Sequence, residues 1–347
     1  RIVGVVYQSV FKADINQYDN ATFYNYDVHG NVIDLLQVNN DLKLVTAGQN
    51  VKRFDYEYDL VSGNVNKVVY QKGLKDQFIH RYSYDSDNRI TIVETSSNGI
   101  HYEKDAKYFY YDHGPLARVE IGESKVQAED YAYTIQGWLK AVNGEELSSD
   151  DLMGQDGIST ATPNLNKNVA KDAFGYSLNY FDGDYTSANT DMLTYSSSSA
   201  NHGASLYNGN IRSMYTAISS LYTMNSTLPT HQTVYNYDQL NRIISMQGFN
   251  RNASDLASVS SGYSSEYSYD ANGNLKTLKR NAFDGGEPKL IDDFTYNYKK
   301  AGNIEINNQL DYVDDLKGKV LSSDLGNQSA NNYLYDAIGQ LTHDESE

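Results

Sequence analysis

The side chains best suited to chemistry show no catalytic spacing in this chain of 347 residues. The chain has no Cys, which excludes thiol catalysis, thiolate zinc sites and disulfide bonds. Its seven His include no His-Glu-x-x-His motif and no pair at the spacing of a metal site on one helix face. Gly175-Tyr176-Ser177 lacks the final Gly of a nucleophile elbow, and no glycine-rich phosphate loop occurs. We therefore predict that the protein is not an enzyme and binds no cofactor.

Carboxylates are the most plentiful reactive groups. They gather between Asp14 and Asp27, at Asp150-Asp151, at Asp182-Gly183-Asp184 and at Asp314-Asp315. Such clusters can hold Ca²⁺, but none follows the twelve-residue calcium loop with its terminal Glu. Two carboxylates about 5–10 Å apart across a sugar cleft would instead suit a glycosidase. We interpret these clusters as solvated acidic surface and turn caps, and predict no metal site.

The elements that position these groups must be built from an acidic, tyrosine-rich composition. Lys+Arg 28 against Asp+Glu 45 gives a net charge of -17, which disfavours binding to nucleic acid and to anionic membranes. No run approaches the ~18 apolar residues of a membrane helix. With 32 Tyr, 10 Phe and 1 Trp, Tyr must supply much of the buried surface. The chain opens Arg1-Ile2-Val3 without Met or a signal sequence, as expected of a segment of a longer protein.

One unit recurs: Tyr-x-Tyr-Asp, two residues, Gly or Asn, a polar residue and an aliphatic one. Five close copies begin at Tyr24, Tyr82, Tyr235, Tyr267 and Tyr333. Four looser copies are Tyr56-Glu57-Tyr58-Asp59 with Gly63, Phe109-Tyr110-Tyr111-Asp112 with Gly114, Tyr131-Ala132-Tyr133-Thr134 with Gly137, and Tyr296-Asn297-Tyr298-Lys299 with Gly302. The second Tyr recurs every 22 to 37 residues, except across one gap of 104.

Each unit has the chemistry of a β-hairpin. Residues i and i+2 of a strand share a face, so both Tyr rings point the same way. Asp followed three residues later by Gly or Asn suits a turn that the Asp side chain caps and that ends in a left-handed residue, which leaves a bulge. Nine units therefore predict an all-β protein of antiparallel hairpins, on the order of eighteen strands.

We expect these hairpins to form one sheet that curls, because twisted sheets beyond about ten strands rarely stay flat. A propeller is disfavoured because its blades need a regular period. The paired Tyr rings are expected to be covered, although Tyr is also common on exposed strands. The residues assigned to the repeat are Tyr24, Tyr26, Asp27, Gly30, Tyr56, Tyr58, Asp59, Tyr82, Tyr84, Asp85, Tyr111, Asp112, Tyr131, Tyr133, Gly137, Trp138, Tyr235, Tyr237, Asp238, Tyr267, Tyr269, Asp270, Gly273, Tyr296, Tyr298, Gly302, Tyr333, Tyr335, Asp336 and Gly339.

Three regions follow from the spacing of the repeats. Residues 1–143 and 231–347 are predicted to be repeat sheet, the second continuing toward a C-terminal core absent from this sequence. Residues 144–230 are rich in Ser, Thr, Asn, Gly and Asp and break the repeat. We expect an ordered, plug-like insertion with strands and one short helix around Gly209 to Leu221, and the alternative is a disordered excursion.

The units resemble the YD repeats of the RHS family, whose pattern is Tyr-x-Tyr-Asp, a turn Gly, then Arg or Asn and Leu or Ile. Arg89-Ile90 and Arg242-Ile243 match that pattern best. Residues 131–140, 171–185 and 207–211 resemble stretches of the RHS proteins common in Bacteroidetes. The resemblance covers most of the chain.

The resemblance implies a spiralling sheet that forms part of a hollow shell. In polymorphic toxins of the family the shell holds a variable C-terminal toxin, so we expect a secreted or surface structural segment that encloses an effector. Its partners would be the remaining repeats, that cargo and a secretion translocon, with type IX export as the expected route. The alternative is a cell-surface adhesin that binds glycans through Tyr-rich β-surfaces. No cleavage or toxin residue of the family is assigned to this sequence.

Overall fold

The protein is built from antiparallel strands, as predicted from the repeat. The computed structural model describes residues 2–7, 20–39, 50–145, 147, 153–157, 166–186, 203–218, 230–252, 255–284, 287–302, 304–318 and 325–345. These residues contain twenty-one strands and one short 3₁₀ turn, η1 (Met153–Gln155). No helix in this part of the chain is long and apolar enough to cross a membrane.

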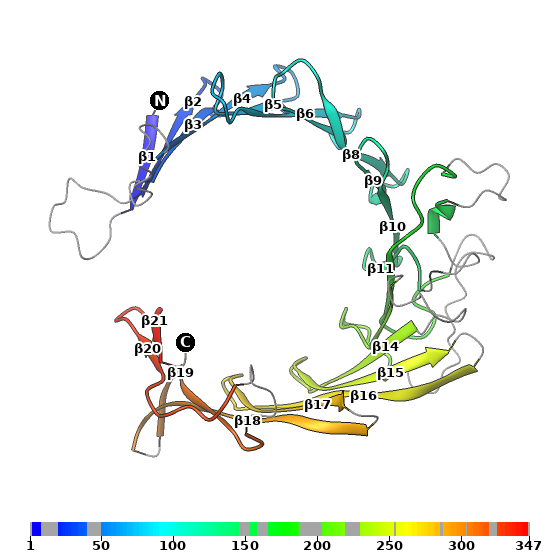
Figure 1. Ribbon diagram of the computed structural model, residues 1–347, viewed down its shortest axis with the longest axis vertical. Helices are drawn as coiled ribbons and strands as arrows, with labels where there is room; N and C mark the ends of the chain where they lie inside the picture. Colours follow the sequence, from blue (N-terminus) through cyan, green and yellow to red (C-terminus); the bar gives the residue numbers. More distant parts are fainter. Residues whose placement is uncertain are drawn as a thin grey trace. The chain divides into compact units, whose positions relative to one another are not determined.

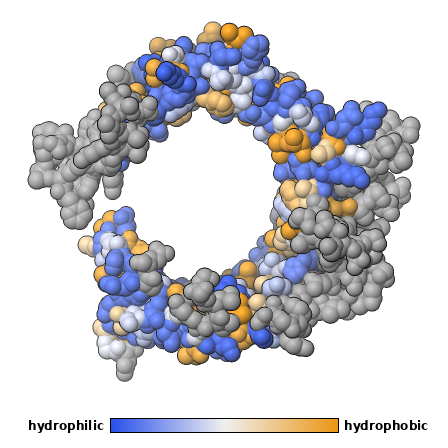
Figure 2. Space-filling view, in the orientation of Figure 1, coloured by the Kyte–Doolittle hydropathy of each residue, from blue (hydrophilic) through white to orange (hydrophobic). Residues whose placement is uncertain are grey.

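The chain divides into two compact units. Unit 1 comprises residues 1–129 and 156–171, and unit 2 comprises residues 130–155 and 172–347. In both units the strands follow one another in chain order (Figure 1). Hydrophilic and hydrophobic residues are interspersed over the strands of both units (Figure 2).

Unit 1 is a meander in which each strand pairs antiparallel with the next. Its strands are β1 (Ile2–Tyr7), β2 (Asn20–Tyr26), β3 (Val32–Asn39), β4 (Val51–Tyr58), β5 (Val65–Tyr70), β6 (Phe78–Tyr84), β7 (Ile90–Ser96), β8 (Glu103–Tyr110) and β9 (Leu116–Ile121). The return strands β5 and β7 are rich in Val, Ile and Thr, whose branched side chains suit a pleated surface.

Unit 2 continues the same pattern and includes β10 (Gln127–Tyr133) from residue 130 onward. Its other strands are β11 (Leu139–Val142), β12 (Phe174–Asn179), β13 (Ser213–Ile218), β14 (Thr230–Tyr237), β15 (Ile243–Asn252), β16 (Asp255–Tyr269), β17 (Leu275–Asp284), β18 (Glu287–Ala301) and β19 (Ile304–Asp315). Each pairs antiparallel with the next. β20 (Tyr333–Tyr335) and β21 (Leu341–Asp344) form a separate two-stranded sheet.

A β-bulge marks the second Tyr of every unit. In the unit that begins at Tyr82, the register shifts between Ser83 and Tyr84, and Tyr84 pairs with Ile90. The same shift occurs at Tyr26, Tyr58, Tyr110, Tyr133, Tyr237, Tyr269, Tyr298 and Tyr335. The hairpins with bulges that the sequence predicts are therefore confirmed.

One unit is shifted by a residue from its predicted frame. Tyr110, and not Tyr111, takes the place of the second Tyr, because the bulge lies between Phe109 and Tyr110. Tyr111 occupies the place of the turn Asp: its N–H donates to Pro115 O at 2.9 Å, and its C=O accepts from Gly114 N at 2.9 Å. The frame is decided by Gly114, which has φ 119° and ends the turn. The assignment of Tyr111 and Asp112 to the repeat was therefore wrong in this unit.

The middle of the chain contributes strands to the sheet of unit 2. β12 and β13 pair with each other, β12 pairs with β11 and β13 pairs with β14. The short helix predicted around Gly209 to Leu221 is wrong for residues 213–218, which form β13. Its side chains alternate between buried and half-buried, up to the exposed Ile218 at its end. Alternating burial with Thr216 and Ile218 favours a strand over a helix. Residues 219–221 lie outside the described part of the chain.

Apolar burial is modest and is shared between aliphatic side chains and half-buried Tyr rings. Val69, Ile79 and Val119 are buried on the strands of unit 1. In unit 2 Ala132, Ala141 and Met153 form a buried cluster, which fixes η1 against the sheet. The paired tyrosines of the repeat are half-buried throughout, neither enclosed nor freely exposed. Tyr24 and Tyr26 stack with ring centroids 6.3 Å apart, as expected of residues on one strand face.

Candidate functional site

The turn of each close repeat is capped by its own Asp. Asp85 Oδ1 accepts from the backbone N–H groups of Asp87 and Arg89, both at 2.9 Å, and its Oδ2 accepts from Arg89 Nε at 2.8 Å. The hydrogen bond from the Arg89 backbone is the main cause that lowers the pKa of Asp85. The same backbone pattern is present at Asp27, Asp238, Asp270 and Asp336. The prediction that Asp caps the turn is confirmed at these positions.

The residue three places after the capping group is left-handed. Asn88 and Asn241 have φ values of 62° and 63°, where most units have Gly. Asn tolerates this conformation better than other residues with a Cβ, which explains why it replaces Gly in the repeat.

The hydroxyl of the second Tyr joins one hairpin to the hairpin before it. Tyr84 Oη donates to the backbone C=O of Val65 at 2.7 Å, and Val65 begins the return strand of the preceding unit. Equivalent bonds run from Tyr58 to Val32, Tyr110 to Ile90, Tyr237 to Ile211, Tyr269 to Ile243 and Tyr298 to Leu275, at 2.7 to 2.9 Å. Burial raises the pKa of Tyr58, Tyr84 and Tyr237. These phenols therefore stay protonated at neutral pH and donate hydrogen bonds to backbone carbonyls of the sheet.

In two units the polar residue after Asn is an arginine that links its hairpin to the next one along the chain. Arg242 Nη1 donates to Asp270 O at 3.0 Å, and its guanidinium lies 4.7 Å from the ring centroid of Tyr269. Arg89 lies in the same way over Tyr110, at 4.5 Å, and donates to Gly114 O. Neighbouring turns are thus joined in both directions along the sheet.

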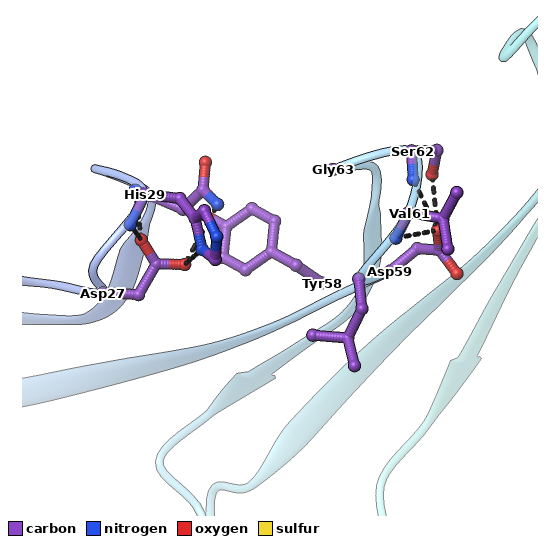
Figure 3. Close-up of a pocket in the computed structure, with 9 residues that line it drawn as sticks. Asp27, His29, Tyr58, Asp59, Val61, Ser62 and Gly63 are labelled. Atoms are coloured by element: carbon purple, nitrogen blue, oxygen red, sulfur yellow. Dashed lines mark hydrogen bonds and ion pairs between the residues drawn. The ribbon is translucent and has the colours of Figure 1, made fainter.

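A shallow pocket lies between two of these turns in unit 1 (Figure 3). It is lined by Asp27, His29, Asn31, Tyr58 and the turn residues 59–63. Asp59 accepts from the N–H groups of Val61 and Ser62 and points away from the Asp27 turn (Figure 3). The carboxylates of Asp27 and Asp59 each accept hydrogen bonds within their own turn. The pocket is therefore a space between two capped turns, bordered by the exposed side chains of Leu60 and Val61.

Two repeat units depart from the Asp cap. Thr134 replaces Asp, and its Oγ1 accepts from Trp138 N at 3.1 Å, so a hydroxyl caps this turn. Lys299 replaces Asp after Tyr298, and there strand β18 continues to Ala301 before the turn at Gly302. Lys299 Nζ forms an ion pair with Asp311 of β19. Without the cap the hairpin extends by three residues.

Sequence reasoning missed a repeat in the middle of the chain. Tyr180 Oη donates to Leu139 O at 2.8 Å, and its ring lies 5.0 Å from that of Trp138. These are the contacts that a second Tyr makes in the other units, with Trp138 in the place of Arg89. Tyr180 directly follows strand β12 and has neither a Tyr two residues before it nor an Asp after it, so the pattern that defines the repeat does not find it. Alternation over residues 174–180 was the available signal.

Buried ion pairs were also missed. Lys140 Nζ lies 2.8 Å from Asp184 Oδ1 in unit 2, and both side chains are buried. In unit 1, Arg118 Nη2 lies 2.6 Å from Asp156 Oδ1, and burial raises the pKa of Asp156 against the opposing effect of Arg118. Each pair fastens a connecting segment to a strand. Charge composition alone cannot identify pairs so distant in sequence.

The acidic side chains that cluster in the sequence bind different partners in the structure. Asp182 pairs with Arg212 at 2.7 Å, whereas Asp184 pairs with Lys140. Asp314 accepts from Asn297 and Asp315 from the N–H of Asp293. Asp14 and the pair at 150–151 lie outside the described residues. Within the described ranges no group of three or more His, Asp or Glu side chains is placed to hold a metal ion.

Comparison with known proteins gives a distant structural similarity. No protein-family model and no curated protein matches the sequence. Among solved structures, the chain is similar to the Tc holotoxin pore of Photorhabdus luminescens, with 12% sequence identity and a TM-score of 0.28. The match covers 98% of this chain and 19% of that one, so the chain spans about a fifth of the length of the structure it matches.

Proposed function

We propose that the chain is a non-catalytic structural segment of a secreted or surface RHS-type shell, whose spiralling sheet encloses an effector from the same polypeptide. The observation that carries the proposal is the regular set of tyrosine hydroxyl bonds between successive hairpins. A wall needs each hairpin to hold the next, and these bonds together with the arginine contacts perform that task.

The same observation favours a wall over an adhesin. A glycan-binding aromatic platform needs exposed ring faces and free hydroxyls. The second Tyr of six units instead donates its hydroxyl to the backbone, and the rings are half-buried. We therefore place recognition of sugars by these tyrosines second.

The proposal is tested by limited proteolysis of the whole polypeptide that contains this chain. The segment after residue 347 should be cleaved much more slowly in the intact protein than when it is expressed alone. Equal cleavage rates would overturn enclosure, as would a reading frame that ends at this residue. A glycan array serves as the second arm: binding that is lost in Tyr267→Ala would support the adhesin instead.

A further inference from the structure

A buried lysine of unit 2 faces an asparagine and an aspartate. Lys140 lies on β11, Asn179 ends β12, and Asp184 lies in the loop that follows. Lys140 Nζ is 2.8 Å from Asn179 Oδ1 and 2.8 Å from Asp184 Oδ1. The exposed fractions of the three residues are 0%, 7% and 8%, so the cluster is shielded from water. Neither the wall proposed above nor the repeat pattern requires a lysine at this position.

The carboxamide carbon of Asn179 lies where the lysine amine could attack it. Because a carbonyl bond is about 1.23 Å long, Lys140 Nζ lies within about 4 Å of Asn179 Cγ. Asn179 Nδ2 is buried and has no hydrogen-bond partner among the residues that the structure describes. Buried amide nitrogens are normally paired, so this nitrogen is unusual in not being held in place by its surroundings. It is the atom that would have to depart if the lysine attacked Cγ.

The lysine and the aspartate form a proton-transfer pair. Burial lowers the pKa of Lys140, and Asp184 opposes that effect, while Glu145 and Arg212 are the other charged groups that act on it. Asp184 Oδ2 accepts from the N–H of Tyr180 at 2.8 Å, which aims Oδ1 at the lysine. Buried lysines become nucleophiles when a neighbouring group removes the ammonium proton.

We propose that Lys140 and Asn179 form an intramolecular isopeptide bond. The ammonium of Lys140 gives a proton to Asp184, and the neutral amine attacks Asn179 Cγ. The new Nζ–Cγ bond forms, and the Cγ–Nδ2 bond then breaks. The second amine proton and the proton on Asp184 supply the hydrogens with which Nδ2 leaves as ammonia or ammonium. Amine plus carboxamide thus become a secondary amide plus ammonia, with no oxidant and no external reactant.

Asn179 is the acceptor because the alternative, Asp184, is a poorer one. Both Asp184 oxygens are already hydrogen-bonded, and an attack on Asp184 would consume the group that takes the lysine proton. Asp184 is therefore assigned the proton transfer. The product would join β11 to the end of β12 covalently and close the chain between positions 140 and 179, which restricts the unfolding of that segment.

The mass of the purified full chain tests the proposal directly. We expect a mass about 17 Da below that of the sequence, from the loss of one ammonia. A tryptic digest should contain the peptide 126–167 linked to the peptide 172–212, because Lys140 would resist cleavage. An unchanged mass would overturn the proposal. A loss of about 18 Da with a link to Asp184 would overturn the choice of Asn179.

Matched variants assign the roles. Lys140→Arg and Asn179→Ala should both abolish the mass loss, whereas Lys171→Arg, at an exposed lysine of unit 1, should keep it. Asp184→Asn should prevent or greatly slow the bond, and Asp182→Asn, two residues away and paired with Arg212, should not. Bond formation in Asp184→Asn at the wild-type rate would refute the proton transfer. If a variant does not fold, the mass of the wild-type chain still decides the proposal.

Discussion

At the scale of single residues, the turn chemistry explains most of the repeat. Asp85 holds its turn through hydrogen bonds to two backbone N–H groups and to Arg89. Charged acceptors make stronger bonds than neutral ones, so the cap depends on ionisation of the carboxylate. Asn88 then takes the left-handed conformation that closes the turn. Each repeat is in this sense a local structure that needs little help from the rest of the chain.

Ionisation of the capping Asp predicts acid sensitivity. The pKa of Asp85 is lowered in the folded state, chiefly by the hydrogen bond from the Arg89 backbone, relative to about 3.9 in an unfolded chain. A lowered carboxyl pKa contributes stability above the unfolded pKa, and that contribution disappears as pH falls through the folded value. Asp85→Asn should therefore be less stable at neutral pH and lose less stability on acidification below about pH 4.

The measurement is the melting temperature followed by circular dichroism from neutral to acidic pH. Ser86→Ala, an exposed and uncharged position of the same turn, is the control and should follow the wild type. A pH profile of Asp85→Asn that parallels the wild type would show that the cap does not depend on charge.

At the scale of elements, hairpins are joined through side chains as well as through the backbone ladder. The second Tyr reaches back to the preceding hairpin, and Arg89 or Arg242 reaches forward to the next. The same two contacts reappear at Tyr180 and Trp138, where the sequence pattern is lost. The connection between hairpins is therefore retained more widely than the Tyr-x-Tyr-Asp motif.

Removing one hydroxyl tests this connection. Tyr84→Phe keeps the ring but loses the hydrogen bond to Val65 O, and should lower the free energy of unfolding by about 1 kcal/mol. Tyr26→Phe is the matched control, since the Tyr26 hydroxyl makes no hydrogen bond within the described residues, and its change should stay within about 0.5 kcal/mol. Urea denaturation measures both. Equal losses in the two variants would contradict a role for the interhairpin bond.

At the scale of the whole molecule, the net charge of -17 opposes association between chains through strand β1. β1 has the sequence IVGVVY, without charge or Pro, and pairs with β2 as the first strand of the unit 1 meander. A strand of this composition favours association wherever its other edge is unpaired, unless charge or Pro protects it. Repulsion between acidic chains resists that association at low salt, where the Debye length is about 30 Å at 0.01 M.

Association should therefore increase with salt. Sedimentation velocity of the chain should show larger species at about 0.15 M salt, where the Debye length falls to about 8 Å, than at low salt. Val5→Lys should reduce these species because it places a charge on β1. Val28→Lys adds the same charge at an exposed turn and should have little effect. A monodisperse wild type at both salt concentrations would show that the edge of β1 is protected.

The amino-acid sequence was sufficient for the hairpins, the Asp caps, the left-handed Gly and Asn positions and the bulges. These features depend on residues at most a few positions apart, and local backbone sterics and hydrogen bonds decide them. The frame at Tyr110 was missed because adjacent Phe109, Tyr110 and Tyr111 all suit a strand. The left-handed Gly114, three residues after Tyr111, fixes the frame, and the pairing of Tyr110 with Leu116 agrees with it.

Only the tertiary structure revealed the partners of the tyrosine hydroxyls, the repeat that ends at Tyr180 and the buried Lys140–Asn179–Asp184 cluster. Tyr84 and Val65 are 19 residues apart, and Lys140 and Asp184 are 44 apart. Contacts at such separations depend on which strands pair and in what register. No local preference encodes that choice, because it follows from the packing of one hairpin against the next.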